Sequence, residues 1–381
     1  MTDTIQSTAA PAAVPKKASR RIAGIDLAEA ICILIVVVYH LSLARYKVYY
    51  YRDLPAAFNY YVRCYYAAGC PIFFMANGYL LFHHSFNLKK HLRKTGWMIF
   101  LTIFWFVVSF LVLSPIRSSP LTLQAFWAEW QNFIDVNIHL WYMGALVVVY
   151  LLFPLMKMAY DADKRIFLAF WLYVFIANFG TRLLNQGYTL YSFLFHGYRG
   201  TEKDIVWLSI FNLFNNHNGI ALSFFGIGAF LPEITEWIKK RLPKTSTRNF
   251  VLVVTMMAAA FVQGLWFLFM NYCRGYYMCP VWFGFNNLPN LVIAVNLLLL
   301  CMNYPGRNPK IYGPICKISN NTLGIYLLHE FFVQPLRVLM PQYTPWLCNL
   351  AGNILVSCII MAACIGLATI FHKIPGLKKL L

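Results

Sequence analysis

The first apolar segment of the chain carries a histidine and two carboxylates, side chains that can move protons or bind cations. Glu29 and His40 are separated by eleven positions. On a helix this spacing returns both side chains to within about 20° of one face, about 16.5 Å apart along the axis. Asp26 falls about 40° to the other side of His40. Because His40 is too far from both carboxylates for a direct hydrogen bond, we expect two sites, or two ends of one path.

Other polar residues are expected to surround the His40 imidazole. They lie in the stretches IHLWYMGA, FNLFNNHNG and YLLHEFF. A strongly polar side chain in hydrocarbon costs about 2.5 to 3.5 kcal/mol at a helix centre, so such residues tend to face the interior of a bundle. The alternatives are a histidine bound only to a backbone carbonyl, an interfacial aromatic belt and hydrogen bonding between helices. The candidates are His139, Trp141, Asn216, His217, Tyr326, His329 and Glu330.

A second group of polar and basic residues is expected at the opposite end of the segments. It contains Asn77, in FFMANGYLL, and Lys90, Arg93 and Lys94, in the run KKHLRK. Clustered cations at a membrane face can anchor the topology or hold the phosphates of an anionic cofactor, and the residues alone leave both open. No His/Cys spacing typical of zinc occurs, so no metal is predicted.

The composition indicates which kind of secondary structure positions these residues. The 381 residues are 60% hydrophobic and 12% charged, and the mean hydropathy is +0.58, which excludes a water-soluble protein. A helix needs about 20 apolar residues to cross hydrocarbon. We therefore predict an all-α, polytopic membrane protein of about ten transmembrane helices. The candidate segments are 24–44, 65–83, 96–113, 139–156, 165–181, 207–230, 250–270, 287–303, 317–336 and 346–371.

The basic residues predict the orientation of these segments. Most of the 32 Lys and Arg residues fall on one side if the N-terminus is cytoplasmic, which predicts both termini in the cytoplasm. The net charge of +19 then reflects topology and contact with membrane lipids, and nucleic-acid binding is not needed to explain it. We expect a disordered basic tail (1–23), a membrane domain (24–371) and a short basic tail (372–381). A disulfide between Cys273 and Cys279, near the outer face, is a pairing to test.

Four motifs in the same order resemble the signatures of membrane acyltransferase family 3. They are RIAGIDLAEAICILIVVVYH, FFMANGYLL, HLWYMGALVVVYLLFPLM and SNNTLGIYLLHEFF, and the similarity runs from about residue 20 to 371. Members of this family are ten-span O-acyltransferases of bacteria that modify surface glycans. The resemblance implies acetyl-CoA or a similar thioester as donor and a sugar hydroxyl of a surface or lipid-linked glycan as acceptor. It also implies the bacterial cytoplasmic membrane as location.

The resemblance assigns roles to individual residues. His40 matches the first-span histidine thought essential in the family, whereas Glu29 stands where the family usually has Arg or Lys. Asn77 stands where the second motif more often has Ser. Lys90, Arg93 and Lys94 match a loop proposed to meet the phosphates of CoA.

The chemistry expected of this site is acyl transfer from a thioester to a hydroxyl. His40 would be the general base, or a nucleophile that carries the acyl group across the bilayer. Glu29 would pair with an inner cation or orient the CoA end, and the polar residues around His40 would shape the acceptor side. The rival function is a transporter or flippase that exports a glycan or lipid-linked saccharide through the polar interior. Release of free CoA separates the two.

Overall fold

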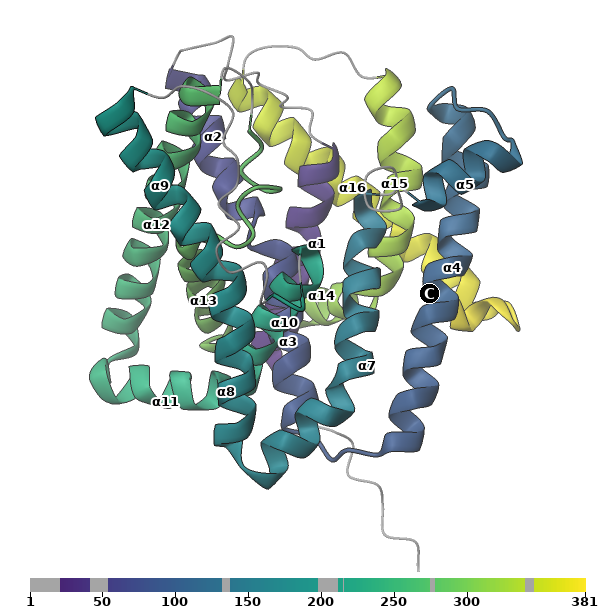
Figure 1. The fold of residues 1–381 in the computed structure, drawn as a ribbon. Coiled ribbons are helices and arrows are strands. Elements are labelled where there is room, and N and C mark those ends of the chain that lie inside the picture. Colours follow the sequence, from purple (N-terminus) through teal and green to yellow (C-terminus); the bar gives the residue numbers. More distant parts are fainter. Residues whose placement is uncertain are drawn as a thin grey trace, which may run out of the picture.

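The structure is a computed structural model that describes residues 21–41, 54–131, 138–197, 212–214, 216–274, 278–339 and 346–381. Within these ranges the chain forms helices and no strand, which confirms the all-α prediction. Most of the long helices run between the upper and lower ends of the molecule in Figure 1.

The helices are joined by connections of different lengths. In chain order the longer elements are α1 (Ala23–Leu41), α2 (Leu54–Tyr66), α3 (Gly69–Phe82), α4 (Leu88–Ile116), α5 (Leu123–Gln131), η1 (Ile138–Leu140), α7 (Trp141–Ala162), α8 (Lys164–Phe175), η2 (Ile176–Gly180), α9 (Thr181–His196), α10 (Asn216–Ala229), α11 (Leu231–Arg241), α12 (Thr245–Arg274), α13 (Leu288–Met302), α14 (Pro309–Asn320), α15 (Thr322–Leu339) and α16 (Trp346–Lys373). A short turn, η4 (Leu377–Lys379), follows α16.

Each of the ten predicted segments overlaps at least one helix, although residues 42–44, 207–211 and 215 of these segments lie outside the described residues. Among the described residues, six helices are long and apolar enough to span a membrane, or seven if the bent pair α10 and α11 forms one span. Three predicted segments account for the difference: α3 and α13 have only 14 and 15 residues, and α15, with 18 residues, is not among the helices that are apolar enough. The structure thus shows a multi-pass membrane protein, while the number of ten spans and the cytoplasmic placement of both termini stay predictions.

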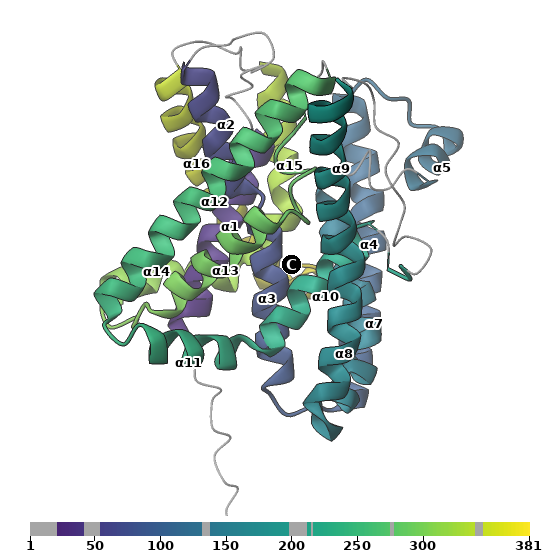
Figure 2. The same cartoon turned by 60° about the vertical axis from the view of Figure 1, so that its left-hand side comes forward.

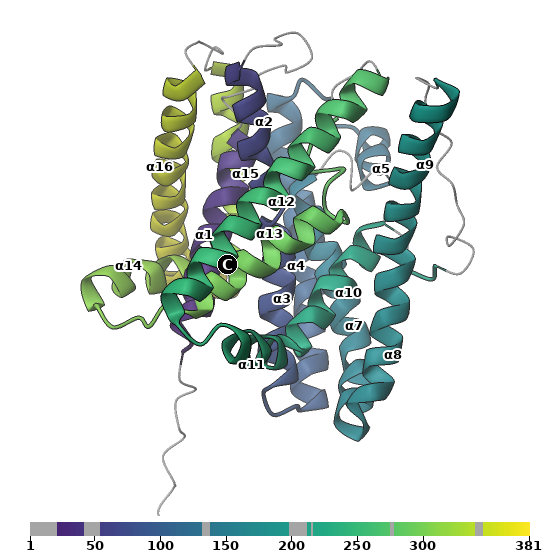
Figure 3. The same cartoon turned by 90° about the vertical axis from the view of Figure 1, so that its left-hand side faces the viewer.

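Helix α1 lies in the interior of the bundle. It contacts α3, α13, α14, α15 and α16, and Figure 3 shows it between α16 and α13. A helix that is apolar on all sides is expected to be buried on all sides. Cys32, Ile33 and Val37 are accordingly fully buried. The central position of α1 brings Glu29 and His40 into contact with other helices.

Helices α3 and α10 approach each other closely at two glycines. A Cβ atom on Gly78 would lie 2.1 Å from the carbonyl oxygen of Phe225, and one on Gly228 would lie 2.1 Å from that of Met75. Small residues allow two helix backbones to come this close inside a membrane. The α10 helix then bends by 57° into α11, which lies across the lower end of the molecule in Figure 2.

The α3–α10 contact predicts that Gly78→Ala destabilises the protein. The added methyl group would meet the backbone of α10, so the helices must move apart, at a cost of about 1–3 kcal/mol. The midpoint of thermal unfolding in detergent measures the change. Gly96→Ala in α4 is the control, because nothing lies within 4 Å of its Cβ position. Equal midpoints for the two variants would contradict the close contact.

The C-terminal residues return to the bundle. The indole nitrogens of Trp97 and Trp105 in α4 donate hydrogen bonds to the carbonyl oxygens of Lys379 (3.1 Å) and Leu380 (2.9 Å). Leu380 and Leu381 pack against the hydrophobic core. The segment predicted as a short basic tail therefore lies along α4, and its location on the cytoplasmic side stays a prediction.

The disulfide between Cys273 and Cys279 is not formed in the structure. The Cys279 sulfur instead lies 3.6 Å from the hydroxyl oxygen of Tyr39, next to His40 in α1. This contact attaches the segment before α13 to the end of α1 that carries the histidine.

Candidate active site

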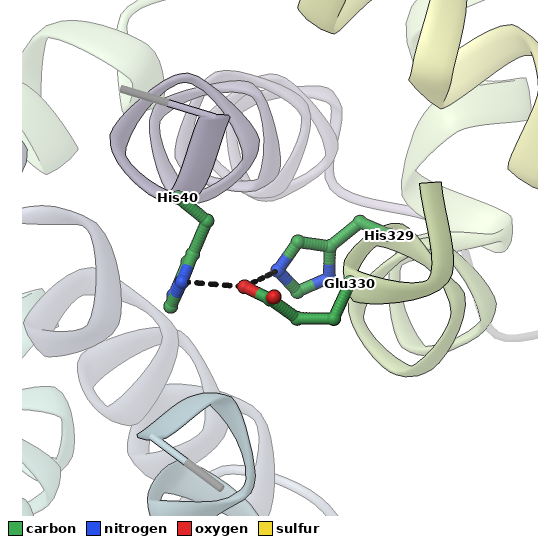
Figure 4. Close-up of side chains that lie close together, drawn as sticks. All are labelled: His40, His329 and Glu330. Carbon is green, nitrogen blue, oxygen red and sulfur yellow. Dashed lines mark ion pairs between the residues drawn. The ribbon is translucent and has the colours of Figure 1, made fainter. Parts of the chain in front are cut away.

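His40 and Glu330 form a buried pair between two helices. His40 Nδ1 lies 2.7 Å from Glu330 Oε1, and both side chains are at least 90% buried. His40 comes from the last turn of α1 and Glu330 from the middle of α15, as Figure 4 shows. The second oxygen, Glu330 Oε2, accepts a hydrogen bond of 2.6 Å from Gln334 Nε2, one helical turn later. A buried carboxylate needs such partners, because an unpaired charge in an apolar interior is strongly unfavourable.

His329 lies against the same carboxylate. Its Nε2 is 3.8 Å from Glu330 Oε1, and its ring centroid is 5.1 Å from that of His40. The Nδ1 atom lies 2.7 Å from the carbonyl oxygen of Tyr326 and 3.2 Å from that of Ile325. A carbonyl only accepts hydrogen bonds, so Nδ1 of His329 carries a hydrogen. The side chain is fully buried.

A third imidazole belongs to the same cluster. His139, in η1 just before α7, is buried, and its ring centroid lies 5.9 Å from that of His329. Its Nε2 atom has no hydrogen-bond partner among the described residues. The structure thus brings three histidines, from α1, η1 and α15, around Glu330, although the helices that carry them are far apart in sequence.

Aromatic side chains lie beside this cluster. Trp141, two residues after His139, packs against His217 of α10 with ring centroids 4.7 Å apart. Trp282 and Phe285, in the turn before α13, complete the aromatic group at 5.5 Å from His217 and 5.2 Å from Trp141. Cys279 of the same turn contacts Tyr39, so this aromatic group is connected to the histidine end of α1.

Two further residues, Tyr326 and Asn216, were also expected around His40. Tyr326 is buried, and its ring centroid lies 6.0 Å from that of His329 and 5.5 Å from that of Tyr142. Asn216 is the first residue of α10, but its side chain lies outside the described part of the structure.

The opposite end of the bundle contains a second polar group. Lys94 Nζ donates a hydrogen bond of 3.2 Å to the Tyr150 hydroxyl, which donates one of 3.0 Å to Asn77 Oδ1. Two residues predicted to contact a cofactor are therefore joined through Tyr150 of α7. Lys90 and Arg93 are exposed on the first turns of α4. The buried His91 fixes this end of α4, because its Nε2 lies 2.8 Å from the Tyr150 carbonyl oxygen.

Glu29 belongs to a third group of contacts, at the start of α1. Asp26 accepts hydrogen bonds from Arg21 Nη2 and from the Tyr312 hydroxyl, both at 2.5 Å. The hydrogen bond to Asp26 raises the pKa of Tyr312 to about 12. Ser319 Oγ lies between the two carboxyl groups, 2.9 Å from Asp26 Oδ1 and 2.6 Å from Glu29 Oε2. Glu29 and His40 are therefore separated, as expected: Glu29 contacts Ser319, whereas His40 contacts Glu330.

The shared hydroxyl of Ser319 predicts a proton on Glu29. One hydroxyl donates only one hydrogen, and Asp26 already pairs with the Arg21 cation, so the second contact requires a protonated Glu29. Glu29→Gln should retain the unfolding midpoint, because its amide can donate to Ser319. Glu29→Ala leaves the buried network incomplete and should cost about 1–3 kcal/mol.

Infrared spectroscopy and thermal unfolding together check this assignment. The carbonyl stretch of a protonated carboxyl should be present in the wild type and absent from Glu29→Gln. Equal destabilisation by Gln and Ala, or a spectrum unchanged by Glu29→Gln, would show that Glu29 is ionised.

Sequence reasoning missed several residues of these groups. Gln334 follows Glu330 by four positions, a spacing that places both side chains on one face of a helix and could have been recognised. Tyr150, Trp282 and Ser319 have no such local signal, because each is brought into place by a helix or turn distant in sequence.

The His40, His329 and Glu330 side chains also have the chemistry of metal ligands. One potential ligand atom from each residue lies within 4.8 Å of the others. Two ligands of one Zn²⁺ ion are expected about 3.3 Å apart, given metal–ligand distances of about 2.0–2.1 Å. The 2.7 Å between His40 and Glu330 is a hydrogen-bond distance. The described geometry thus fits a hydrogen-bonded pair, and the expectation of no metal stays a prediction.

The fold and this cluster define a membrane protein with a buried histidine–carboxylate site. A family model described as an acyltransferase domain matches residues 22–373, nearly the whole chain. The chain therefore belongs to membrane acyltransferase family 3, which confirms the resemblance, and an acyltransferase activity is supported. No curated protein and no solved structure shows a significant match to it.

Proposed function

We propose that this protein transfers an acetyl group from acetyl-CoA to a sugar hydroxyl of a surface or lipid-linked glycan in the bacterial cytoplasmic membrane. The family supports acyl transfer. The observation that carries the rest is the buried contact of 2.7 Å between His40 Nδ1 and Glu330 Oε1. A histidine oriented by a carboxylate is a common arrangement for removing a proton from a hydroxyl nucleophile.

The pair assigns an orientation to the imidazole. With Nδ1–H donating to Glu330, the opposite nitrogen, Nε2, holds the lone pair that accepts the proton of the acceptor hydroxyl. The carboxylate stabilises the imidazolium that results. The hydroxyl oxygen then attacks the thioester carbonyl carbon, and the proton on His40 returns to the departing sulfur of CoA. If the acetyl group is relayed instead, His40 Nε2 is the atom that carries it.

The two ends of the bundle are assigned to the two substrates. The phosphates of the donor would bind Lys90, Arg93 and Lys94. Asn77 would belong to the same site, because Tyr150 links it to Lys94 through hydrogen bonds. Glu29 would hold the inner end of α1 through Ser319. Trp141, Asn216, His217 and Tyr326 would contact the acceptor, together with the cluster around Glu330. Aromatic rings suit the apolar faces of a sugar, and amides and imidazoles suit its hydroxyl groups.

The proposal predicts that His40→Ala abolishes acetylation. Loss of a general base costs about 10²–10⁴-fold in rate. Purified protein in lipid is supplied with acetyl-CoA and with glycan extracted from cells that lack the gene, and free CoA and acetylated glycan are both measured. His196→Ala is the control, because His196 is exposed on α9. Acetylation retained by a normally folded His40→Ala would refute the assignment, and a wild type that releases no CoA would favour a transporter.

The donor end predicts a selective effect of the basic run. We expect combined Lys90→Gln, Arg93→Gln and Lys94→Gln to raise the KM for acetyl-CoA by about tenfold or more, since each lost charged hydrogen bond is worth about 1.5–3 kcal/mol. The KM for acetyl-pantetheine, which lacks the CoA phosphates, should stay unchanged.

The comparison of the two donors separates binding from anchoring. A run that only anchors the topology would change neither KM once the protein is inserted. Lys310→Gln, an exposed lysine on α14, is the matched control for loss of positive charge. Equal increases for both donors would contradict a phosphate site.

A further inference from the structure

His329 carries a buried nitrogen that the proposed reaction does not yet use. Its Nδ1 faces the carbonyl oxygens of Tyr326 and Ile325, so Nδ1 holds the hydrogen. In the neutral ring the lone pair is therefore on Nε2. That atom is fully buried and has no hydrogen-bond partner among the described residues. A buried polar atom without a partner is unfavourable, so its retention needs an explanation.

The position of Nε2 offers that explanation. It lies 3.8 Å from Glu330 Oε1, the same oxygen that His40 Nδ1 approaches to 2.7 Å. Figure 4 shows both imidazoles directed at this one carboxylate from α1 and from α15. One carboxylate can thus stabilise a positive charge on either ring, but His40 and His329 are not equivalent. The tautomer of His329 is determined by backbone carbonyls of its own helix, whereas that of His40 depends on Glu330.

An acyl relay through His40 requires a second base. Once His40 Nε2 is acylated, it has no lone pair left to accept the proton of the acceptor hydroxyl. The ring of His329 lies 5.1 Å from that of His40, centroid to centroid, so a hydroxyl that attacks the acyl carbon can reach His329 Nε2. His139 joins the cluster through His329, with ring centroids 5.9 Å apart.

We propose that the reaction proceeds in two steps, an inference that rests on the proposed acetyl transfer. His40 Nε2 carries the acetyl group, and His329 Nε2 acts as the base in the second step. In the first step, Nε2 of His40 attacks the thioester carbon, the C–S bond breaks, and CoA leaves as thiolate. The acylated His40 ring, still protonated at Nδ1, carries a positive charge that the Glu330 carboxylate stabilises.

In the second step the acceptor hydroxyl attacks the acyl carbon. The O–H proton passes to His329 Nε2, the new C–O bond forms, and the C–N bond to His40 breaks, which returns His40 to its neutral form. His329 is then an imidazolium beside Glu330. Its proton balances the thiolate released in the first step, so the sum of the two steps is acetyl-CoA plus alcohol giving ester plus CoA thiol.

Two asparagine variants separate the steps. An Asn amide nitrogen can replace Nδ1–H of histidine but has no counterpart of Nε2. His329→Asn therefore keeps a donor for the Tyr326 carbonyl, and His40→Asn keeps one for Glu330. Exchange of labelled CoA into acetyl-CoA without acceptor measures the first step. Transfer of labelled acetyl groups to glycan extracted from cells lacking the gene measures both steps.

We expect His329→Asn to keep CoA exchange within about threefold of the wild type and to lose acetyl transfer by about 100-fold or more. His40→Asn should lose both activities, and His196→Asn should lose neither. A purely structural role of His329 would reduce exchange and transfer together. If His329→Asn does not fold, His329→Gln is assayed in the same way.

Three results would overturn the inference: transfer retained by His329→Asn, exchange and transfer lost equally, or a wild type that transfers acetyl groups without exchange. The last result means direct transfer, and the proposed function then stands without the relay. Absence of any acetyl transfer by the wild type would instead refute the proposed function itself.

Discussion

The candidate site depends on a carboxylate buried in the interior of a helical bundle. Glu330 is 2% exposed, and the described residues around it supply one imidazole at 2.7 Å, one amide and two further imidazoles. A carboxylate in such surroundings is stable only if its partners are held in place. The packing of α1 against α15 therefore both stabilises Glu330 and orients His40.

The central position of α1 connects the chemistry to the fold. One helix presents Asp26 and Glu29 at one end and His40 at the other, and its buried apolar residues fill the space between them. The two ends have separate partners: α14 supplies Tyr312 and Ser319 to the carboxyl groups, whereas α15 supplies Glu330 to the histidine. The two ends of one buried helix thus lie in two separate polar environments.

Glu29 differs from the basic residue usual in the family, and its surroundings account for this. The Arg21 guanidinium already occupies the neighbourhood of Asp26, and Ser319 links Asp26 to Glu29. A positive charge is therefore present at the N-terminal end of α1, but it comes from Arg21, which lies before the helix. Glu29 takes part in the hydrogen-bond network of that end instead of supplying its charge.

The sequence by itself determined the helical class, the apolar segments and the family, because hydropathy, periodicity and motif order are local properties of the chain. It also identified His40, His329 and Glu330 as polar residues of buried segments. Only the tertiary structure decided that Glu330 contacts His40, that Tyr150 joins Lys94 to Asn77, and that Trp282 lies beside His217. These contacts depend on the rotation and crossing of helices distant in sequence, which side-chain packing determines and which no local pattern encodes.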